Sequence, residues 1–176
     1  DGSYASLHIL HRDISPPNIL LSRFGDVILS DFGAASSTWL PAHVNSRDAG
    51  TKAYMAPERI IGGGEASVKT DLFALATVLW EILKGQRCFW QNDELKTLEA
   101  IARFDVSQPT RRISGLSPRL SEVLRKNLDR DPARRFDDAY QVLQRLAQAG
   151  EAAQAEQARI SLASLVNESM RELGAS

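Results

Sequence analysis

The chain has 176 residues, of which 43% are hydrophobic and 24% are charged, and its formal net charge is −1. This length suits one domain, and the apolar fraction is large enough for a packed core, which excludes a wholly disordered chain. The near balance of 21 basic and 22 acidic residues excludes a general electrostatic attraction to nucleic acid or acidic lipid, so we expect no nucleic-acid partner.

The first third of the chain is predicted to consist of short strands and loops. Residues 18–22 (NILLS) and 26–30 (DVILS) are two apolar runs, and the segment between them contains Gly25 at a turn position. This pattern predicts a β-hairpin. Residues 31–58 contain several Gly and Pro residues and predict a long loop, of a kind that usually carries function.

Helices are predicted for the rest of the chain. Leu72–Trp80 is apolar all round, which predicts a helix over residues 70–84 that is buried on every side. Gly85 is expected to end this helix as its C-terminal cap. Ser117, which precedes Pro118, is expected to start another helix.

Further helices follow from capping residues and apolar periodicity. Asp137 or Asp138 is expected to cap a helix at 139–146, and apolar residues recur at helical spacing within 95–102 and 162–173. The predicted fold class is therefore α+β and mostly α, in which a small β-hairpin platform leads into a helical bundle.

Four short motifs follow one another in the first 58 residues. They are His11-Arg12-Asp13 followed by Asn18, then Asp31-Phe32-Gly33, then Gly50-Thr51, and finally Ala56-Pro57-Glu58. Each arises by chance when taken alone, but their order is specific. The motifs resemble the catalytic loop, the metal-binding triplet and the end of the activation segment of eukaryotic-type protein kinases. His11–Asn18 (HRDISPPN) is similar to a variant among bacterial kinases of this type.

The resemblance implies a protein-kinase C-terminal lobe that uses ATP and Mg²⁺ to phosphorylate a protein substrate. Asp13 would orient the attacking hydroxyl or accept its proton. Asn18 and Asp31 would be the Mg²⁺ ligands, and Leu20 would lie under the adenine ring of ATP. The alternative for the three polar residues is that they are ordinary turn residues near strand ends.

The activation segment has its own implied residues. Thr51 resembles the substrate-facing threonine of serine/threonine kinases. Arg12 is expected to bind a phosphate on this segment, added by an activating kinase or by self-phosphorylation. Ser46 lies nearest to the family position of such a phosphate, and the other candidates are Ser36, Ser37 and Thr38. The alternative is that Ser46 and Thr51 are plain loop residues.

The remaining implied residues are structural. His11 and Phe32 belong to the motifs themselves. Asp71 is expected to hydrogen-bond back to the catalytic loop, although a carboxylate at a helix start is also favoured by the helix dipole. Glu58 is expected to form an ion pair with Arg135, and Arg134, the residue before Arg135, is the competing partner.

The sequence departs from the kinase pattern in two ways. Ser15 stands where most serine/threonine kinases have a lysine that stabilises the transferred phosphate, so a slower reaction is expected. Only ten residues precede His11, and no G-x-G-x-x-G occurs anywhere. We therefore expect residues 1–147 to be a C-terminal lobe without its N-terminal lobe, inactive by itself, and 148–176 to be an Ala/Gln/Glu-rich helical tail.

Two other functions share some of these features. A catalytically inert, pseudokinase-like module could bind a protein on its helical surface, but the retained Asp13, Asn18 and Asp31 argue against it. A small-molecule phosphotransferase would use the same acidic residues. The Thr51 and Ala56-Pro57-Glu58 segment argues against that reading, because these motifs build a platform for a protein substrate.

The expected location is cytoplasmic. A single cysteine, Cys88, excludes an internal disulfide and a multi-cysteine metal site, and favours a reducing compartment. No signal peptide is visible near the start of the chain. The longest apolar run, Leu72–Trp80, is about half of the ~20 residues that a membrane span needs, so no membrane segment is expected.

Overall fold

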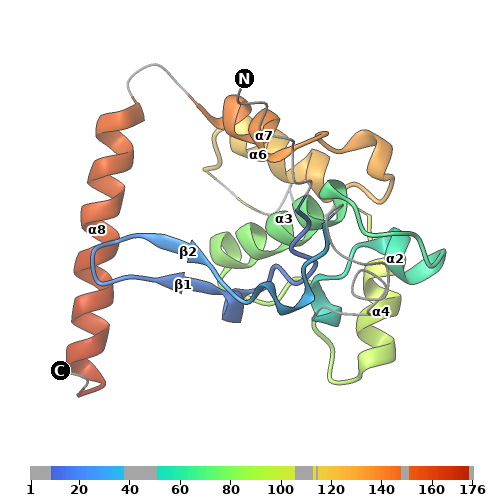
Figure 1. Ribbon diagram of the computed structural model, residues 1–176, viewed down its shortest axis with the longest axis horizontal. Coiled ribbons are helices and arrows are strands. Elements are labelled where there is room, and N and C mark those ends of the chain that lie inside the picture. Colours follow the sequence, from blue (N-terminus) through green and yellow to red (C-terminus); the bar gives the residue numbers. More distant parts are fainter. Residues whose placement is uncertain (1–8, 38–50, 106–112, 114, 148–150, 175–176) are drawn as a thin grey trace. The chain divides into compact units, whose positions relative to one another are not determined.

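The computed structural model of the chain describes residues 9–37, 51–105, 113, 115–147 and 151–174. They form two compact units (Figure 1), one comprising Asp1–Ser15 with Asp31–Leu146 and the other Pro16–Ser30 with Ala147–Ser176. In the described part of the chain, no helix is long and apolar enough to cross a membrane.

The elements follow one another along the chain as η1 (Pro16–Asn18), β1 (Ile19–Leu21), β2 (Val27–Leu29), η2 (Phe32–Ala34), η3 (Lys52–Tyr54), α2 (Pro57–Ile61), α3 (Val68–Lys84), α4 (Glu94–Ala102), α6 (Pro118–Asn127), η4 (Pro132–Arg134), α7 (Ala139–Leu146) and α8 (Glu151–Glu172). The prediction of a mostly helical α+β fold with a small hairpin is confirmed. The short helices η2 and η3 lie in the stretch that the sequence predicted as loop.

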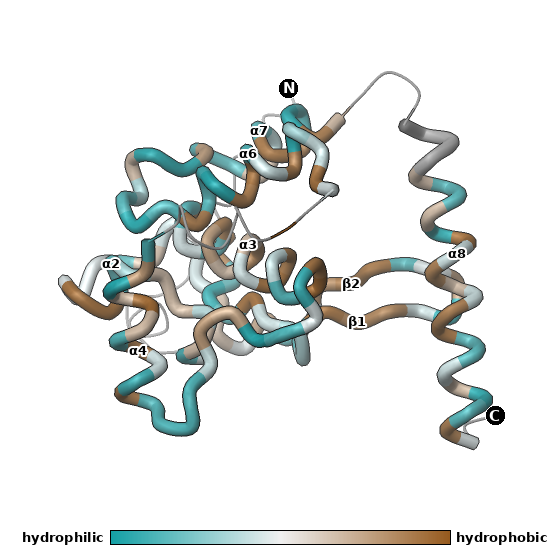
Figure 2. Tube along the Cα trace, turned by 180° about the vertical axis from the view of Figure 1, so that it is seen from behind, coloured by the Kyte–Doolittle hydropathy of each residue, from teal (hydrophilic) through white to brown (hydrophobic). Residues whose placement is uncertain are grey.

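Helix α3 is the centre of the larger unit, and α6 packs against it (Figure 1). Phe73, Ala76 and Trp80 of α3 are buried in one cluster with Leu124 of α6. Leu72 of α3 belongs to a second cluster on another side of the helix. The apolar run Leu72–Trp80 is thus buried on more than one side, as predicted, and this fits the hydrophobic colouring of α3 in Figure 2. The last turn of the helix differs from the prediction, because Ile82 and Leu83 are exposed.

Capping side chains define where several helices begin. The α3 helix starts two residues earlier than predicted, because the Thr70 hydroxyl accepts a hydrogen bond from the Ser67 amide at 3.1 Å and closes the first turn. Ser117 caps α6 by accepting from the Leu120 amide. Of the two candidate caps for α7, Asp138 is the one that accepts from a helix amide, that of Gln141, at 2.7 Å.

The predicted hairpin is confirmed in the smaller unit. Its strands pair antiparallel, with Ile19 opposite Leu29, Leu20 opposite Ile28 and Leu21 opposite Val27. The paired stretch is shorter than the predicted runs. Helix α8 belongs to the same unit and confirms the helical spacing of the last apolar residues, whereas the predicted boundary at residue 147 stays a prediction.

Candidate functional site

The segment that contains His11 is joined to the segment that contains Phe32. Leu10 and Ser36 exchange two backbone hydrogen bonds, of 2.9 and 3.0 Å. One residue further, the buried His11 ring lies edge-on to the Phe32 ring, with centroids 4.7 Å apart. These contacts hold the first two motifs side by side, although about twenty residues separate them in the sequence.

Asp71 anchors the turn that precedes Asp13. Its carboxylate oxygens accept hydrogen bonds from the backbone amides of His11, at 2.7 Å, and Arg12, at 2.9 Å. Arg12 has a φ of 69°, a conformation that costs energy for a side chain with a Cβ, and the two bonds help to hold it there. Burial raises the pKa of Asp71, and the two amide donors oppose that rise.

Asp13 and Thr51 are in direct contact. Asp13 Oδ1 accepts hydrogen bonds from the Thr51 backbone amide at 2.7 Å and from the Thr51 hydroxyl at 2.9 Å. The Asp13 amide in turn donates to His11 Nδ1 at 3.3 Å. Beside them lies a cavity of about 30 Å³ that is lined by Asp13, Thr51, Arg12 and Asp71 among others. A carboxylate oxygen that accepts a hydrogen bond from a hydroxyl group has the geometry that a general base needs.

Asp31 is held in a strained conformation on an exposed turn. Its φ is 59°, and its Oδ1 accepts a hydrogen bond from the Gly33 amide at 3.1 Å. A Cβ on Gly33 would lie 2.9 Å from this same oxygen, so a larger residue there would make the Asp31 carboxylate shift. Oδ2 makes no hydrogen bond to the described residues, and it is therefore available to a cation.

Asn18 and Leu20 belong to the smaller unit, which contains the hairpin. The Asn18 carbonyl accepts from both the amide and the hydroxyl of Ser30, at 2.8 and 3.1 Å, which closes the open end of the hairpin. Leu20 pairs with Ile28 in the ladder, and its side chain is exposed.

The donor chemistry of Asp31 and Asn18 suits magnesium. Mg²⁺ takes oxygen ligands, and it binds through one or two protein groups together with water and substrate phosphates. A carboxylate oxygen that is open to solvent and a side-chain amide oxygen are donors of this kind. Within the described ranges, no group of three or more His, Cys, Asp and Glu residues is arranged as a complete protein cage for a metal.

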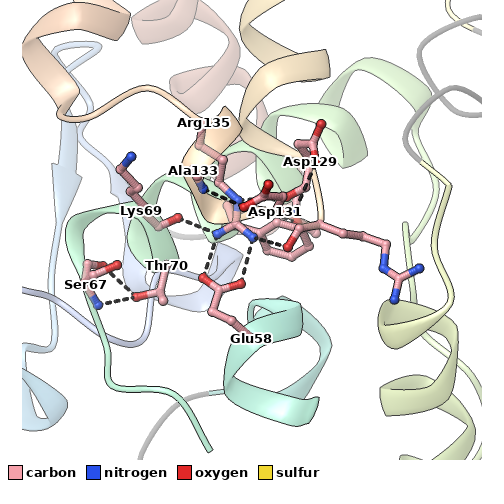
Figure 3. Close-up of polar contacts among 11 residues, drawn as sticks. Glu58, Ser67, Lys69, Thr70, Asp129, Asp131, Ala133 and Arg135 are labelled. Atoms are coloured by element: carbon pink, nitrogen blue, oxygen red, sulfur yellow. Dashed lines mark hydrogen bonds and ion pairs between the residues drawn. The ribbon is translucent and has the colours of Figure 1, made fainter. Parts of the chain in front are cut away.

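The Glu58 carboxylate forms a two-pronged ion pair with the Arg135 guanidinium (Figure 3), with N···O distances of 2.8 and 2.7 Å. Arg135 is fully buried and also donates to the carbonyls of Lys69 and Asp129. Its guanidinium lies 4.9 Å from the centre of the Phe73 ring. Arg134 is 73% exposed and faces Asp129 and Asp131 instead.

Ser15 is buried, with only 1% of its surface exposed. Its hydroxyl has no hydrogen-bond partner among the described residues. A lysine at this position would have to fit a four-carbon stem where Ser15 now packs.

The sequence did not predict a polar cluster that ties the Thr51 segment to the end of α3. The Tyr54 hydroxyl donates to Glu81 Oε2 at 2.8 Å, Arg87 contacts both groups, and the Cys88 amide donates to Glu81 Oε1. Burial and the Glu81 carboxylate raise the pKa of Tyr54. The signal in the sequence was Glu81 itself, a charge that directly follows an apolar run.

Of the four candidate residues for phosphorylation, two lie within the described part of the chain. Thr38 and Ser46 lie outside the described residues. Ser36 is buried where its backbone pairs with Leu10, and Ser37 follows it.

Comparison with known proteins points to a single family. The family model described as "Protein kinase domain" matches residues 4–146. The serine/threonine-protein kinase PknL of Mycobacterium tuberculosis is 32% identical over 143 residues, which are 78% of this chain and 35% of that protein. The serine/threonine-protein kinase PknD of the same species is 35% identical over 141 residues, 79% of this chain and 21% of that protein.

A third relative is PknD of Chlamydia muridarum, also a serine/threonine-protein kinase, which is 31% identical and matches 76% of this chain and 17% of that protein. The chain thus spans about a third or less of the length of these curated relatives. The motifs, the contacts among them and the family match lead to one conclusion: this chain belongs to the protein kinase family.

Proposed function

We propose that this protein is a serine/threonine protein kinase, which transfers the γ-phosphoryl group of ATP to serine or threonine hydroxyls of protein substrates. The observation that carries the proposal is the hydrogen bond from the Thr51 hydroxyl to Asp13 Oδ1 at 2.9 Å. It places a hydroxyl of the same chemical type as the substrate against the group proposed as the base. The names of the relatives agree with serine and threonine as acceptors.

In the proposed reaction, the substrate oxygen forms a bond to the γ-phosphorus. The bond from that phosphorus to the bridging oxygen breaks, and ADP leaves with the electron pair. Asp13 accepts or orients the hydroxyl proton. Asp71 keeps the preceding turn in place through the His11 and Arg12 amides.

Asn18 and Asp31 are proposed as the residues that hold Mg²⁺. The cation would neutralise charge on the phosphates, which is the main requirement of phosphoryl transfer. Asp31 contributes a carboxylate oxygen with no bond to the described residues, and Asn18 a neutral oxygen. Leu20 is proposed to lie under the adenine ring, which its exposed, apolar side chain allows.

The test is phosphate transfer by the complete translated product of the gene, with radiolabelled ATP, Mg²⁺ and casein as substrate. We expect labelled phosphoserine or phosphothreonine. Asp13→Asn is expected to lower kcat by ~100-fold or more, since a positioned base contributes at least that factor.

The control is Asp138→Asn, the same chemical change at the cap of α7. Asparagine is as good a cap as aspartate, so activity is expected to stay at the wild-type level. Absence of transfer by a folded wild-type protein, together with absence of ATP·Mg²⁺ binding in calorimetry, would instead support the inert binding module.

A further inference from the structure

The β1–β2 hairpin is too small to be stable by its own contacts. Each strand has three residues, and five of the six side chains are exposed. An isolated two-stranded hairpin is marginally stable at best in water. Another element must therefore hold it if Asn18, which directly precedes β1, is to keep a fixed position.

The turn of the hairpin is built around Ser22 and Asp26. The Ser22 amide donates to the Asp26 carbonyl at 2.9 Å, and the Gly25 amide donates to the Ser22 carbonyl at 3.0 Å. The Ser22 hydroxyl accepts from the amides of Phe24 and Asp26. Gly25 has a φ of 83°, as in a three-residue turn that ends in a left-handed residue.

Helix α8 supplies donors for two further carbonyls of this turn, those of Arg23 and Phe24. Arg159 Nη1 donates to the Phe24 carbonyl at 2.8 Å, and Asn167 Nδ2 donates to the Arg23 carbonyl at 3.0 Å. The Arg159 guanidinium is itself oriented by Glu156, through bonds of 2.9 and 2.7 Å. Figures 1 and 2 both show α8 crossing the tip of the hairpin.

The backbones of the turn and the helix are in close contact. A Cβ on Gly25 would lie 1.9 Å from the Arg159 carbonyl oxygen and 2.8 Å from its carbonyl carbon, and backbone atoms cannot swing aside as a side chain can. The half-buried residues Leu162, Val166 and Met170 recur every four positions along the part of α8 that contains Asn167. Glycine at this turn position thus serves the helix contact as well as the turn.

We propose that α8 is a brace for the hairpin, and that Arg159 and Asn167 are positioning residues for Asn18. By holding the turn, they keep the strands in register up to the Asn18–Ser30 bonds at the other end. This role rests on the proposed function only in its consequence for Mg²⁺, since the bracing itself is a property of the fold.

Hydrogen exchange of the complete protein, read by mass spectrometry, tests the brace directly. In the double variant Arg159→Ala/Asn167→Ala, we expect the amides of residues 19–29 to exchange about tenfold faster or more, because two hydrogen bonds that oppose opening are lost. Peptides from α3 should exchange as in the wild type, which shows that the rest of the protein is folded. Unchanged exchange in residues 19–29 would overturn the proposal.

Two matched controls separate the contact from general effects. Arg171→Ala removes an exposed arginine of the same helix and should leave the hairpin unchanged. Gly25→Ala and Gly63→Ala both place alanine at a positive φ, but nothing lies within 4 Å of a Cβ on Gly63. Only Gly25→Ala should therefore speed exchange in both the hairpin and α8, and equal effects of the two substitutions would count against the brace.

The consequence for catalysis has its own measurement. In the double variant, the Mg²⁺ concentration for half-maximal phosphate transfer is expected to rise several-fold, with kcat at saturating Mg²⁺ nearly unchanged. Faster hairpin exchange without this rise would refute the positioning role. If the wild-type protein transfers no phosphate at all, the proposed function fails while the exchange experiment still decides whether α8 braces the hairpin.

Discussion

Buried polar groups are the residues whose replacement should matter most in this protein. Arg135 is fully buried, and its guanidinium donates hydrogen bonds to oxygen atoms, including the two of Glu58. Asp71 is held in the same manner by two backbone amides. Removal of one member from such a group leaves the other without its partner in a poorly solvated place, which is the costly situation.

Arg135→Leu is expected to lower the free energy of unfolding by about 3–5 kcal/mol, because it leaves the Glu58 carboxylate unpaired. Arg134→Leu is the control, and since Arg134 is 73% exposed its effect should stay within about 0.5 kcal/mol. Urea unfolding followed by circular dichroism measures both. Equal losses in the two variants would show that the ion pair with Glu58 adds nothing to the free energy of unfolding.

Ser15 gives a prediction of opposite sign for two substitutions. Ser15→Ala removes a buried hydroxyl with no partner among the described residues, so stability should be unchanged or should rise by up to about 1 kcal/mol. Ser15→Lys introduces the residue of most serine/threonine kinases but forces a long side chain into a site packed around serine, and should cost about 1–3 kcal/mol. Thermal unfolding compares them, and a Ser15→Lys protein as stable as the wild type would contradict the prediction.

At the scale of the elements, single polar side chains set the ends of helices and join neighbouring helices. Asp93 and Ser117 begin α4 and α6 by accepting a hydrogen bond from an amide in the first turn. Glu122 of α6 and Arg145 of α7 then join their two helices, with Arg145 Nε donating to Glu122 Oε2 at 2.6 Å. The hydrogen bond from Arg145 lowers the pKa of Glu122.

The lowered pKa of Glu122 predicts how this contact responds to acid. The folded chain binds the proton of Glu122 less tightly than the unfolded chain does, so the unfolded state takes up more protons as the pH falls. The stabilisation is complete above the ordinary glutamate pKa and is lost as the pH falls through the lowered value. The wild type should therefore be more stable than Glu122→Gln at neutral pH, and this difference should vanish in acid.

Urea unfolding at a series of pH values measures that difference. Glu99→Gln, on an exposed position of α4, is the matched control and should show little difference from the wild type at any pH. If the gap between the wild type and Glu122→Gln persisted at low pH, the Glu122–Arg145 ion pair would not be its source.

At the scale of the whole molecule, much of the secondary structure could be predicted because its signals are local. The apolar run Leu72–Trp80 predicted the buried helix, and two apolar runs around Gly25 predicted the hairpin. A capping residue marked the start of α6. Such signals come from neighbours in the chain, where backbone geometry sets the spacing of side chains.

The ends of the helices, and the choice between two adjacent residues as a partner or cap, were less predictable from the sequence. The sequence predicted Arg135 as the partner of Glu58 but kept Arg134 as a competitor, and it left Asp137 and Asp138 open as caps. Adjacent residues have the same local chemistry, and they differ only in the direction that the folded backbone gives them. The Tyr54–Glu81–Arg87 cluster was not predicted at all, because its members are brought together only when α3 packs against the Thr51 segment.

The sequence by itself determined the family of this protein, through the order of its motifs, and it determined where the hairpin and most helices lie. Only the tertiary structure decided that the Thr51 hydroxyl meets Asp13, 38 residues away, and that Arg159 holds the turn at Phe24, 135 residues away. The physical reason is one of range. Propensity and periodicity act over a few residues, whereas contacts between distant segments exist only once packing has fixed the backbones that carry them.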